Sequence, residues 1–185
     1  MILRTFLCIE IPAEQKNTIG LWLDARRRDV PDVRWVRPET LHITLKFCGE
    51  IQEDMVQGII RYLTKFKQKG AFMLQIQGIG AFPSFPPARI VWTGVTGALN
   101  RLQEVQNAAE NAALSVGLAR EPRRYTPHIT LGRRNSKDPF PQVQIDTVQS
   151  DPLYTEAWQV NAMILMKSEL FPDGPKYTPL GVFKI

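Results

Sequence analysis

The chain has 185 residues, of which 44% are hydrophobic and 22% charged, and its formal net charge is +5. This length can bury a sizeable core in one globular domain, or in two small lobes that share a core. No stretch of about 18 consecutive apolar residues occurs, which excludes a membrane-spanning helix, and no low-complexity tract or long block of like charge is present. The positive charge favours anionic partners without identifying one.

The predicted elements follow from hydrophobic period and from the positions of proline and glycine. In chain order they are a strand at 1–11, a helix at 13–29, strands at 33–36 and 41–48, a helix at 53–69, strands at 72–82 and 88–95, a helix at 100–117, and strands at 128–133, 160–170 and 178–185. The third helix ends at Gly117, a residue type common at helix C-termini. Arg4 and Glu10 interrupt the apolar opening segment, which argues against a secretory signal.

This order of strands and helices predicts the α+β class, with antiparallel sheets flanked by helices. The tetrapeptide His-Ile-Thr-Leu occurs twice, at 42–45 and 128–131, and the copies are separated by nearly half of the chain. We therefore predict two pseudo-symmetric lobes within a single domain that spans residues 1–185, with one copy of the tetrapeptide in each lobe.

The two tetrapeptides contain the only histidines of the chain, His42 and His128. Side chains at i and i+2 of a strand point to the same face, so His42 shares a face with Thr44, and His128 with Thr130. The aliphatic residues between them would anchor each strand in a core. If the two strands lie close together, two imidazoles and two hydroxyls converge on one cleft.

Other interpretations fit the residues less well. A zinc site normally needs three or four ligands, and neither a third histidine nor a HExxH or CxxC motif is present. No serine or cysteine lies in a recognisable nucleophile motif, and Cys8 and Cys48 are expected to be free thiols in a reducing cytosol. Acid–base chemistry by two imidazoles on an anionic substrate remains as the functional hypothesis, beside a non-catalytic nucleotide-binding module.

Five segments in this order resemble the two-histidine phosphoesterase superfamily, which is defined by two His-x-Thr-x motifs. They are RTFLCIEIP, RWVRPETLHITLKFCGE, GIGAFPSFPPARIVW, RRYTPHITLGR and KSELFPDGPKYTPL, and together they extend over nearly the whole chain. Within the superfamily, the chain is most similar to the RNA 2′,3′-cyclic phosphodiesterases, formerly named 2′-5′ RNA ligases.

The resemblance implies a central groove between the lobes and hydrolysis of RNA 2′,3′-cyclic phosphate ends to a 2′-phosphate. It implies that His42 is the proton donor and His128 the proton acceptor. Thr44 and Thr130 would hydrogen-bond the phosphate oxygens, and Arg133 would contribute a planar guanidinium suited to phosphate.

Three further residues are candidates for substrate binding. Arg89 occupies a position where the family often has arginine, and a structural ion pair is an equal alternative. Phe82, with Phe85, could stack on a terminal base, or pack in the core. Tyr177 could donate a hydrogen bond to the groove, or have a purely structural hydroxyl. The basic loop 133–141 is a candidate RNA-backbone contact.

The chemistry needs no metal and no other cofactor, and we expect none. The expected partner is RNA with a 2′,3′-cyclic phosphate terminus, with tRNA fragments among the candidates, bound by a cytoplasmic monomer that does not associate with membranes. A small nucleotide, such as a cyclic phosphate of ADP-ribose or a 2′-5′ oligonucleotide, is the alternative substrate. The same acid and base could also run the reverse 2′-5′ RNA ligase reaction.

Overall fold

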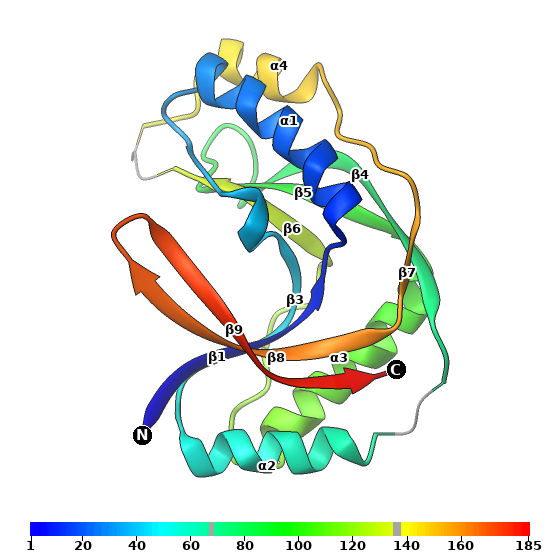
Figure 1. Ribbon diagram of the computed structural model, residues 1–185. Helices are drawn as coiled ribbons and strands as arrows, with labels where there is room; N and C mark the ends of the chain where they lie inside the picture. Colours follow the sequence, from blue (N-terminus) through cyan, green and yellow to red (C-terminus); the bar gives the residue numbers. More distant parts are fainter. Residues whose placement is uncertain (67–68, 135–137) are drawn as a thin grey trace.

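A computed structural model describes residues 1–66, 69–134 and 138–185 (Figure 1). Its elements, in chain order, are β1 (Ile2–Glu10), α1 (Ala13–Asp29), β2 (Arg34–Trp35), the 3₁₀ helix η1 (Pro38–Thr40), β3 (His42–Gln52), α2 (Glu53–Thr64), β4 (Phe72–Phe82), β5 (Ile90–Gly97), α3 (Leu99–Leu114), β6 (His128–Arg133), α4 (Gln142–Gln149), β7 (Trp158–Val160), β8 (Ala162–Phe171) and β9 (Gly174–Lys184).

The strands form two antiparallel sheets. One sheet has four strands in the order β3-β1-β8-β9, and the other has five in the order β2-β6-β5-β4-β7. Each pair of neighbours is antiparallel. The prediction of an α+β fold with antiparallel sheets flanked by helices is confirmed.

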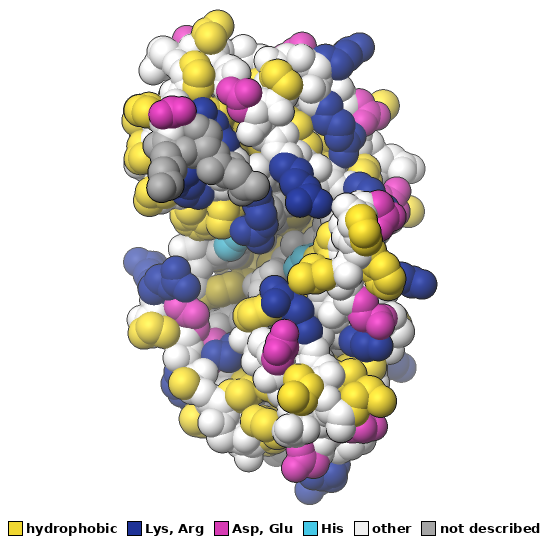
Figure 2. All heavy atoms as spheres, turned by 90° about the vertical axis from the view of Figure 1, so that its left-hand side faces the viewer, with side chains coloured by type: hydrophobic (Ala, Val, Ile, Leu, Met, Phe, Trp, Pro, Cys, Tyr) yellow, Lys and Arg dark blue, Asp and Glu magenta, His cyan; other side chains and the backbone are white. Residues whose placement is uncertain are grey.

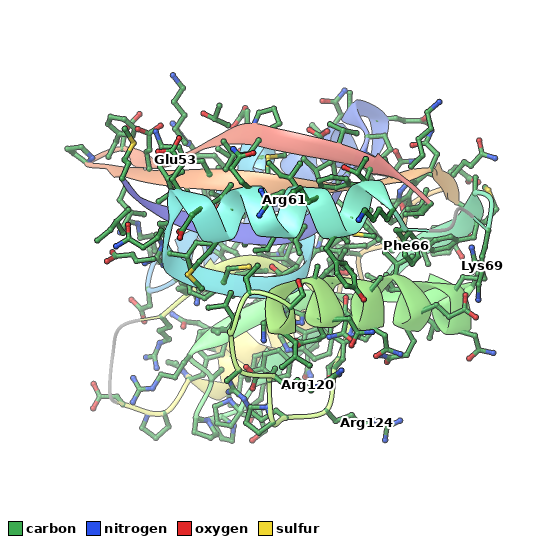
Figure 3. The ribbon with its side chains drawn as sticks, turned by 90° about the horizontal axis from the view of Figure 1, so that it is seen from below. Glu53, Arg61, Phe66, Lys69, Arg120 and Arg124 are labelled. Atoms are coloured by element: carbon green, nitrogen blue, oxygen red, sulfur yellow. The ribbon has the colours of Figure 1, made fainter. Side chains whose placement is uncertain are left out.

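The helices lie on the sheet faces that point away from the space between the sheets. Helices α2 and α3 run side by side beneath the four-stranded sheet, and α1 and α4 lie over the five-stranded sheet (Figures 1 and 3). Helix α2 buries Val56, Ile59 and Leu63 at helical spacing, so one apolar stripe faces the sheet. The inner faces of the sheets are therefore left to line a cleft.

The two sheets do not correspond to the two halves of the chain. The four-stranded sheet takes β1 and β3 from the first half and β8 and β9 from the C-terminus, whereas the five-stranded sheet takes the strands between them together with β2. One hydrophobic cluster contains buried residues of both sheets, among them Ile43 of β3 and Ile129 of β6. The strands that carry the two tetrapeptides are thus joined through a shared core.

Several predicted boundaries were wrong. Helix α2 ends at Thr64 rather than at residue 69, and β9 begins at Gly174 rather than at residue 178. The predicted strand 160–170 corresponds to β8, except that its first residue belongs to the separate short strand β7. Helix α4 was not predicted, because β-branched residues are frequent in it and it buries only Ile145 and Val148. Packing against α1, rather than intrinsic propensity, stabilises so short a helix.

No helix in the described part of the chain is long and apolar enough to cross a membrane.

Candidate active site

Strands β3 and β6 each present a histidine and a threonine on one face. The aliphatic residues that alternate with them are buried in the shared core, namely Ile43, Leu45, Ile129 and Leu131. His42, Thr44, His128 and Thr130 line one cavity between the sheets. The alternation of a strand and the burial of the aliphatic residues therefore bring both imidazoles and both hydroxyls together, as predicted.

Both imidazoles have the same hydrogen bond to the backbone. His42 Nδ1 lies 2.7 Å from the carbonyl oxygen of Thr40, and His128 Nδ1 lies 2.7 Å from that of Thr126. A carbonyl oxygen only accepts, so Nδ1 carries the proton in each ring. Nε2 is then the atom of each imidazole that remains free to gain or lose a proton.

The cavity has a volume of about 630 Å³. Figure 2 shows the histidine side chains in the hollow between the two halves of the molecule, with Lys and Arg side chains around its mouth. Four arginines line this cavity, namely Arg4, Arg34, Arg37 and Arg133. Among the described residues, only Arg37 of these four pairs with a carboxylate, Asp173, at 3.2 Å. The cavity therefore carries an excess of positive charge suited to an anion.

Two of these arginines face each other across neighbouring strands. Arg34 of β2 is the ladder partner of Arg133 of β6. Like charges that lie directly opposite in an antiparallel pair destabilise a sheet. An anion bound between the two guanidiniums would remove this repulsion. Arg34 was missed by sequence reasoning, because the pairing of β2 with β6 joins segments about 100 residues apart.

Burial is the main cause that lowers the pKa of His42 to about 4. The hydrogen bond to Thr40 opposes this shift, while the positive charges of Lys16, His128 and Arg133 add to it. A buried imidazole next to cations prefers the neutral form.

The pKa of His128 is lowered for similar reasons. Burial is again the main cause, the hydrogen bond to Thr126 opposes it, and the charge of Arg133 lowers the pKa further. In the absence of a bound anion, both imidazoles are therefore biased towards the neutral form, with Nε2 ready to accept a proton.

Aromatic rings surround each imidazole. The ring centroids of Phe6 and Tyr177 lie 4.7 and 5.3 Å from that of His42, and the Phe82 centroid lies 4.9 Å from that of His128. Tyr177 lines the cavity, as expected for a groove residue, whereas Phe82 lies edge-on against His128 and is not one of the residues that line it. Phe82 is thus placed to orient an imidazole.

The other candidate residues lie outside the cavity. Arg89 is exposed, and its main chain joins two segments by accepting a hydrogen bond from Arg134 N–H and donating one to the Phe82 carbonyl. Phe85 stacks on Phe140 at 5.7 Å, which is core packing rather than a platform for a base. Within the basic loop 133–141, residues 135–137 lie outside the described part of the structure.

Two contacts tie the strand of the first motif to its surroundings. The hydroxyl of Tyr125, three residues before His128, donates to the carbonyl of Thr44 at 3.1 Å. Lys46 is buried and lies 2.9 Å from the equally buried Glu110 of α3. The first contact links the two motif segments directly, and the second fixes β3 on α3.

A second hollow, of about 810 Å³, lies along α2 and the loop after α3. Arg61, Phe66 and Lys69 line it; Figure 3, in which the molecule is seen from below, shows Arg61 on α2, and Phe66 and Lys69 beyond the C-terminal end of that helix. It contains neither histidine and does not join the candidate active site. In the ranges that the structure describes, no group of three His, Cys, Asp or Glu residues is arranged to hold a metal ion.

Paired imidazoles and hydroxyls in a basic cleft between two antiparallel sheets fit the two-histidine phosphoesterases that the two motifs resemble. A sequence model described as LigT like Phosphoesterase matches residues 9–92, which include the first motif. The chain is 34% identical to an RNA 2′,3′-cyclic phosphodiesterase of Archaeoglobus fulgidus, over 84% of this chain and 85% of that protein. It is 28% identical to an RNA 2′,3′-cyclic phosphodiesterase of Methanothermobacter thermautotrophicus, over 100% of both chains.

A crystal structure of a Thermus thermophilus protein has the same fold, with a TM-score of 0.78 and 25% identity over 98% of this chain and 97% of that one. The chain belongs to the LigT-like phosphoesterase family, as its two motifs indicated.

Proposed function

We propose that this protein is an RNA 2′,3′-cyclic phosphodiesterase that opens the cyclic phosphate with water and leaves a 2′-phosphate. The observation that carries the proposal is the position of both imidazoles in one basic cavity, each with Nδ1 bonded to the backbone and Nε2 free. The names of the curated relatives support the same activity.

In the proposed reaction, the oxygen of a water molecule attacks phosphorus while Nε2 of His128 takes its proton. The bond between phosphorus and the 3′-oxygen breaks, and Nε2 of His42 gives this oxygen a proton. Thr44 and Thr130 donate hydrogen bonds to the non-bridging oxygens, and Arg133 stabilises the charge that develops on them. The assignment of donor and acceptor follows the family resemblance and stays a prediction.

The pKa values add a condition to this assignment. The pKa of His42 is about 4, so at neutral pH His42 is almost wholly neutral without substrate. A phosphate anion beside the ring favours its charged form and raises its pKa. We infer that binding of the substrate causes His42 to become protonated, so that it can act as the proton donor. Binding also positions the bond that breaks.

Several narrower expectations belong to the proposal. The reaction uses no metal ion, and the same groups can run the reverse 2′-5′ ligation. The substrates include tRNA fragments, and the protein acts as a cytoplasmic monomer. The two lobes work as one domain with one motif in each. A small cyclic nucleotide is the alternative substrate, since the catalytic groups read only phosphate and ribose.

The deciding experiment uses a short RNA with a 2′,3′-cyclic end, incubated with the protein in EDTA. We expect an RNA with a 2′-phosphate, identified by its resistance to an enzyme that removes only 3′-phosphates. The variant carrying both His42→Ala and His128→Ala is the control. A 3′-phosphate product, or turnover by the double variant at the rate of the unmodified protein, would contradict the proposal.

A further inference from the structure

Trp92 has no part in the mechanism above, although it lies beside His128. The centroid of its ring is 6.0 Å from that of the His128 imidazole. Trp92 belongs to β5, where it is the ladder partner of Thr130 in β6. Residues directly opposite each other in an antiparallel pair share a face of the sheet, so Trp92 lies on the face that carries His128 and Thr130. It is not one of the residues that line the cavity, which places it behind the imidazole rather than beside a substrate.

Phe82 of β4 completes a cluster of three rings at this histidine. Its centroid lies 4.9 Å from that of His128 and 5.1 Å from that of Trp92. A single hydrogen bond, from Nδ1 to the Thr126 carbonyl, restrains the imidazole only weakly, because the torsion about its Cβ–Cγ bond has broad minima. Phe82 and Trp92 meet the imidazole at interplanar angles of 83° and 58°. Two rings that pack on it in different orientations restrict this rotation and exclude water from part of its surface.

The position of Trp92 depends on Gly80, its ladder partner in β4. A Cβ at Gly80 would lie 2.2, 2.3 and 2.6 Å from Cζ2, Cη2 and Cε2 of the indole. The ring can therefore lie against β4 at this point only because residue 80 has no side chain. Phe82 follows two residues later, on the same face of the strand. Strand β4 thus supplies both the space for the indole and the second ring of the cluster.

The indole N–H does not explain why a tryptophan is present. Nε1 of Trp92 is buried, and in the described ranges of the chain it has no hydrogen-bond partner. A buried donor without an acceptor destabilises a folded protein. An aliphatic residue or a phenylalanine would avoid this penalty. What Trp92 contributes is therefore the size and shape of its ring next to His128.

We propose that Trp92 is a positioning residue, which together with Phe82 holds the imidazole of His128 so that Nε2 points at the water that attacks phosphorus. The inference rests on the proposed function, in which Nε2 of His128 takes the proton of this water. A general base acts only within hydrogen-bond reach of the proton that it removes. Trp92 therefore affects catalysis through His128 and not through contact with the substrate.

The cluster excludes water from His128 without adding a charge. From its own strand and the strands in contact with it, the charged or titratable groups that line the cavity are Arg133, Arg34 and His42. Burial is the main cause that lowers the pKa of His128. A smaller residue in place of Trp92 leaves every charge where it is and admits water. The pKa of His128 should then rise towards its ordinary value.

The first test measures kcat and the pKa of His128 in the same variant. Trp92→Leu should lower kcat by about 10- to 10²-fold, the effect of a displacement of about 1 Å. KM should change little, because both threonines and Arg133 still hold the phosphate. The pKa is followed by NMR of the imidazole, in a His42→Ala background that leaves His128 as the only histidine. Normal kcat, or an unshifted pKa, would overturn the proposal.

A double-mutant cycle with Gly80 separates positioning from a general loss of packing. The three atoms nearest to the methyl group that Gly80→Ala adds all belong to Trp92, so this variant displaces the indole. It should lower kcat by itself. Combined with Trp92→Leu it should cause almost no further loss, because the atoms that it would strike are gone. A full additional loss would show that Gly80→Ala acts on β4 directly, which would contradict the proposal.

Trp158 provides a matched control in the same sheet. Its Nε1 is also buried without a partner in the described chain, but it belongs to β7 at the edge of the five-stranded sheet and does not line the cavity. Trp158→Leu should lower Tm yet leave kcat and the pKa of His128 unchanged at a temperature where the variant is folded. Equal losses of kcat in both leucine variants would refute a specific role of Trp92. Trp92→Phe and Trp158→Phe form a milder pair, which decides by the same criteria if a leucine variant does not fold.

Failure of the proposed function would give a different result, namely no turnover of a cyclic phosphate by the unmodified protein. The NMR titration needs no turnover, so it decides the role of Trp92 in that case. A raised pKa of His128 in Trp92→Leu, but not in Trp158→Leu, supports the ring cluster. Equal values in Trp92→Leu and in the protein with Trp92 intact refute it.

Discussion

The pH dependence of catalysis should differ between kcat/KM and kcat, because the substrate changes the pKa values on which catalysis depends. In the free protein the pKa of His42 is lowered to about 4 and that of His128 is also lowered. The profile of kcat/KM reports the free protein, so its bell should lie on the acidic side of pH 6.5, the ordinary value of an imidazole. At pH 7 only about one His42 ring in a thousand is then charged.

A bound cyclic phosphate changes this balance. One negative charge about 4 Å from an imidazole, at an effective dielectric constant of about 20, contributes about 4 kcal/mol, which corresponds to about three pKa units. An anion favours the protonated ring, so the shift is upward. We therefore expect the limbs of the kcat profile to lie about 1 to 3 pH units above those of kcat/KM.

The assay is steady-state kinetics on a trinucleotide with a 2′,3′-cyclic phosphate end, from about pH 4 to pH 9. The fold is checked by circular dichroism at each pH. The phosphodiester keeps one charge over this range, so the substrate itself adds no limb. The limbs belong to the coupled pair and are not assigned to His42 or His128 individually. Coincident profiles, or a flat kcat/KM between about pH 5 and 8, would refute the reasoning.

Further predictions concern the effect of a chelator, substitutions of two arginines and of both histidines in the cleft, and the buried ion pair between Lys46 and Glu110. Activity should survive EDTA, and loss of turnover that zinc or manganese restores would contradict the acid–base mechanism. Arg133→Lys should lower kcat/KM although it keeps the charge, because a bidentate fork becomes a point donor; an unchanged kcat/KM would place Arg133 outside the site. Arg34→Gln should lower kcat/KM yet raise the free energy of unfolding by about 0.2–1 kcal/mol, since it removes a like-charge pair, and a lower stability in urea denaturation would show that the repulsion is absent. His42→Ala and His128→Ala should each lower kcat by about 10²–10⁴-fold, and the double variant by less than the product of the two; near-normal kcat in either single variant would exclude that residue as acid or base. Lys46→Met should cost about 3–5 kcal/mol, because it leaves Glu110 buried without its partner, and a loss below about 1 kcal/mol in the same assay would mean that Glu110 finds another partner.

The arrangement within each motif could be predicted because it depends on local geometry. A strand alternates its side chains, so the spacing of His42 and Thr44 places them on one face wherever the strand lies. The repeat of His-Ile-Thr-Leu then indicated two equivalent strands. The repeated unit is in fact longer, since Thr40 and Thr126 stand at the same position before each histidine and accept its Nδ1–H. This extended repeat was visible in the sequence and was missed.

The remainder of the cleft depends on which distant segments pair with each other. The hydrophobic period and the secondary-structure propensity of the residues do not predict such pairing. Arg34 enters the site only because β2 pairs with β6. Phe47 enters it only because an extra residue in β3 reverses the alternation. The same bulge withdraws Lys46, which simple alternation would have placed in the cleft. Arg89, which the resemblance suggested, is exposed and lies outside the cavity, and among the described residues only its main chain forms hydrogen bonds, with Phe82 and Arg134.

The two motifs are alike in their own geometry, so any difference between acid and base must come from the lobes around them. Each imidazole has Nδ1 on a carbonyl two residues earlier, and each is followed by a threonine on the same face. Both rings have aromatic neighbours, but these are different residues, Phe6 and Tyr177 at His42 and Phe82 and Trp92 at His128, and Lys16 lowers the pKa of His42 alone. Environments that separate the pKa values of two similar groups are what allow one to act as acid and the other as base. The interleaved strands, which build each sheet from distant parts of the chain, thus give two identical sequence motifs different chemical surroundings.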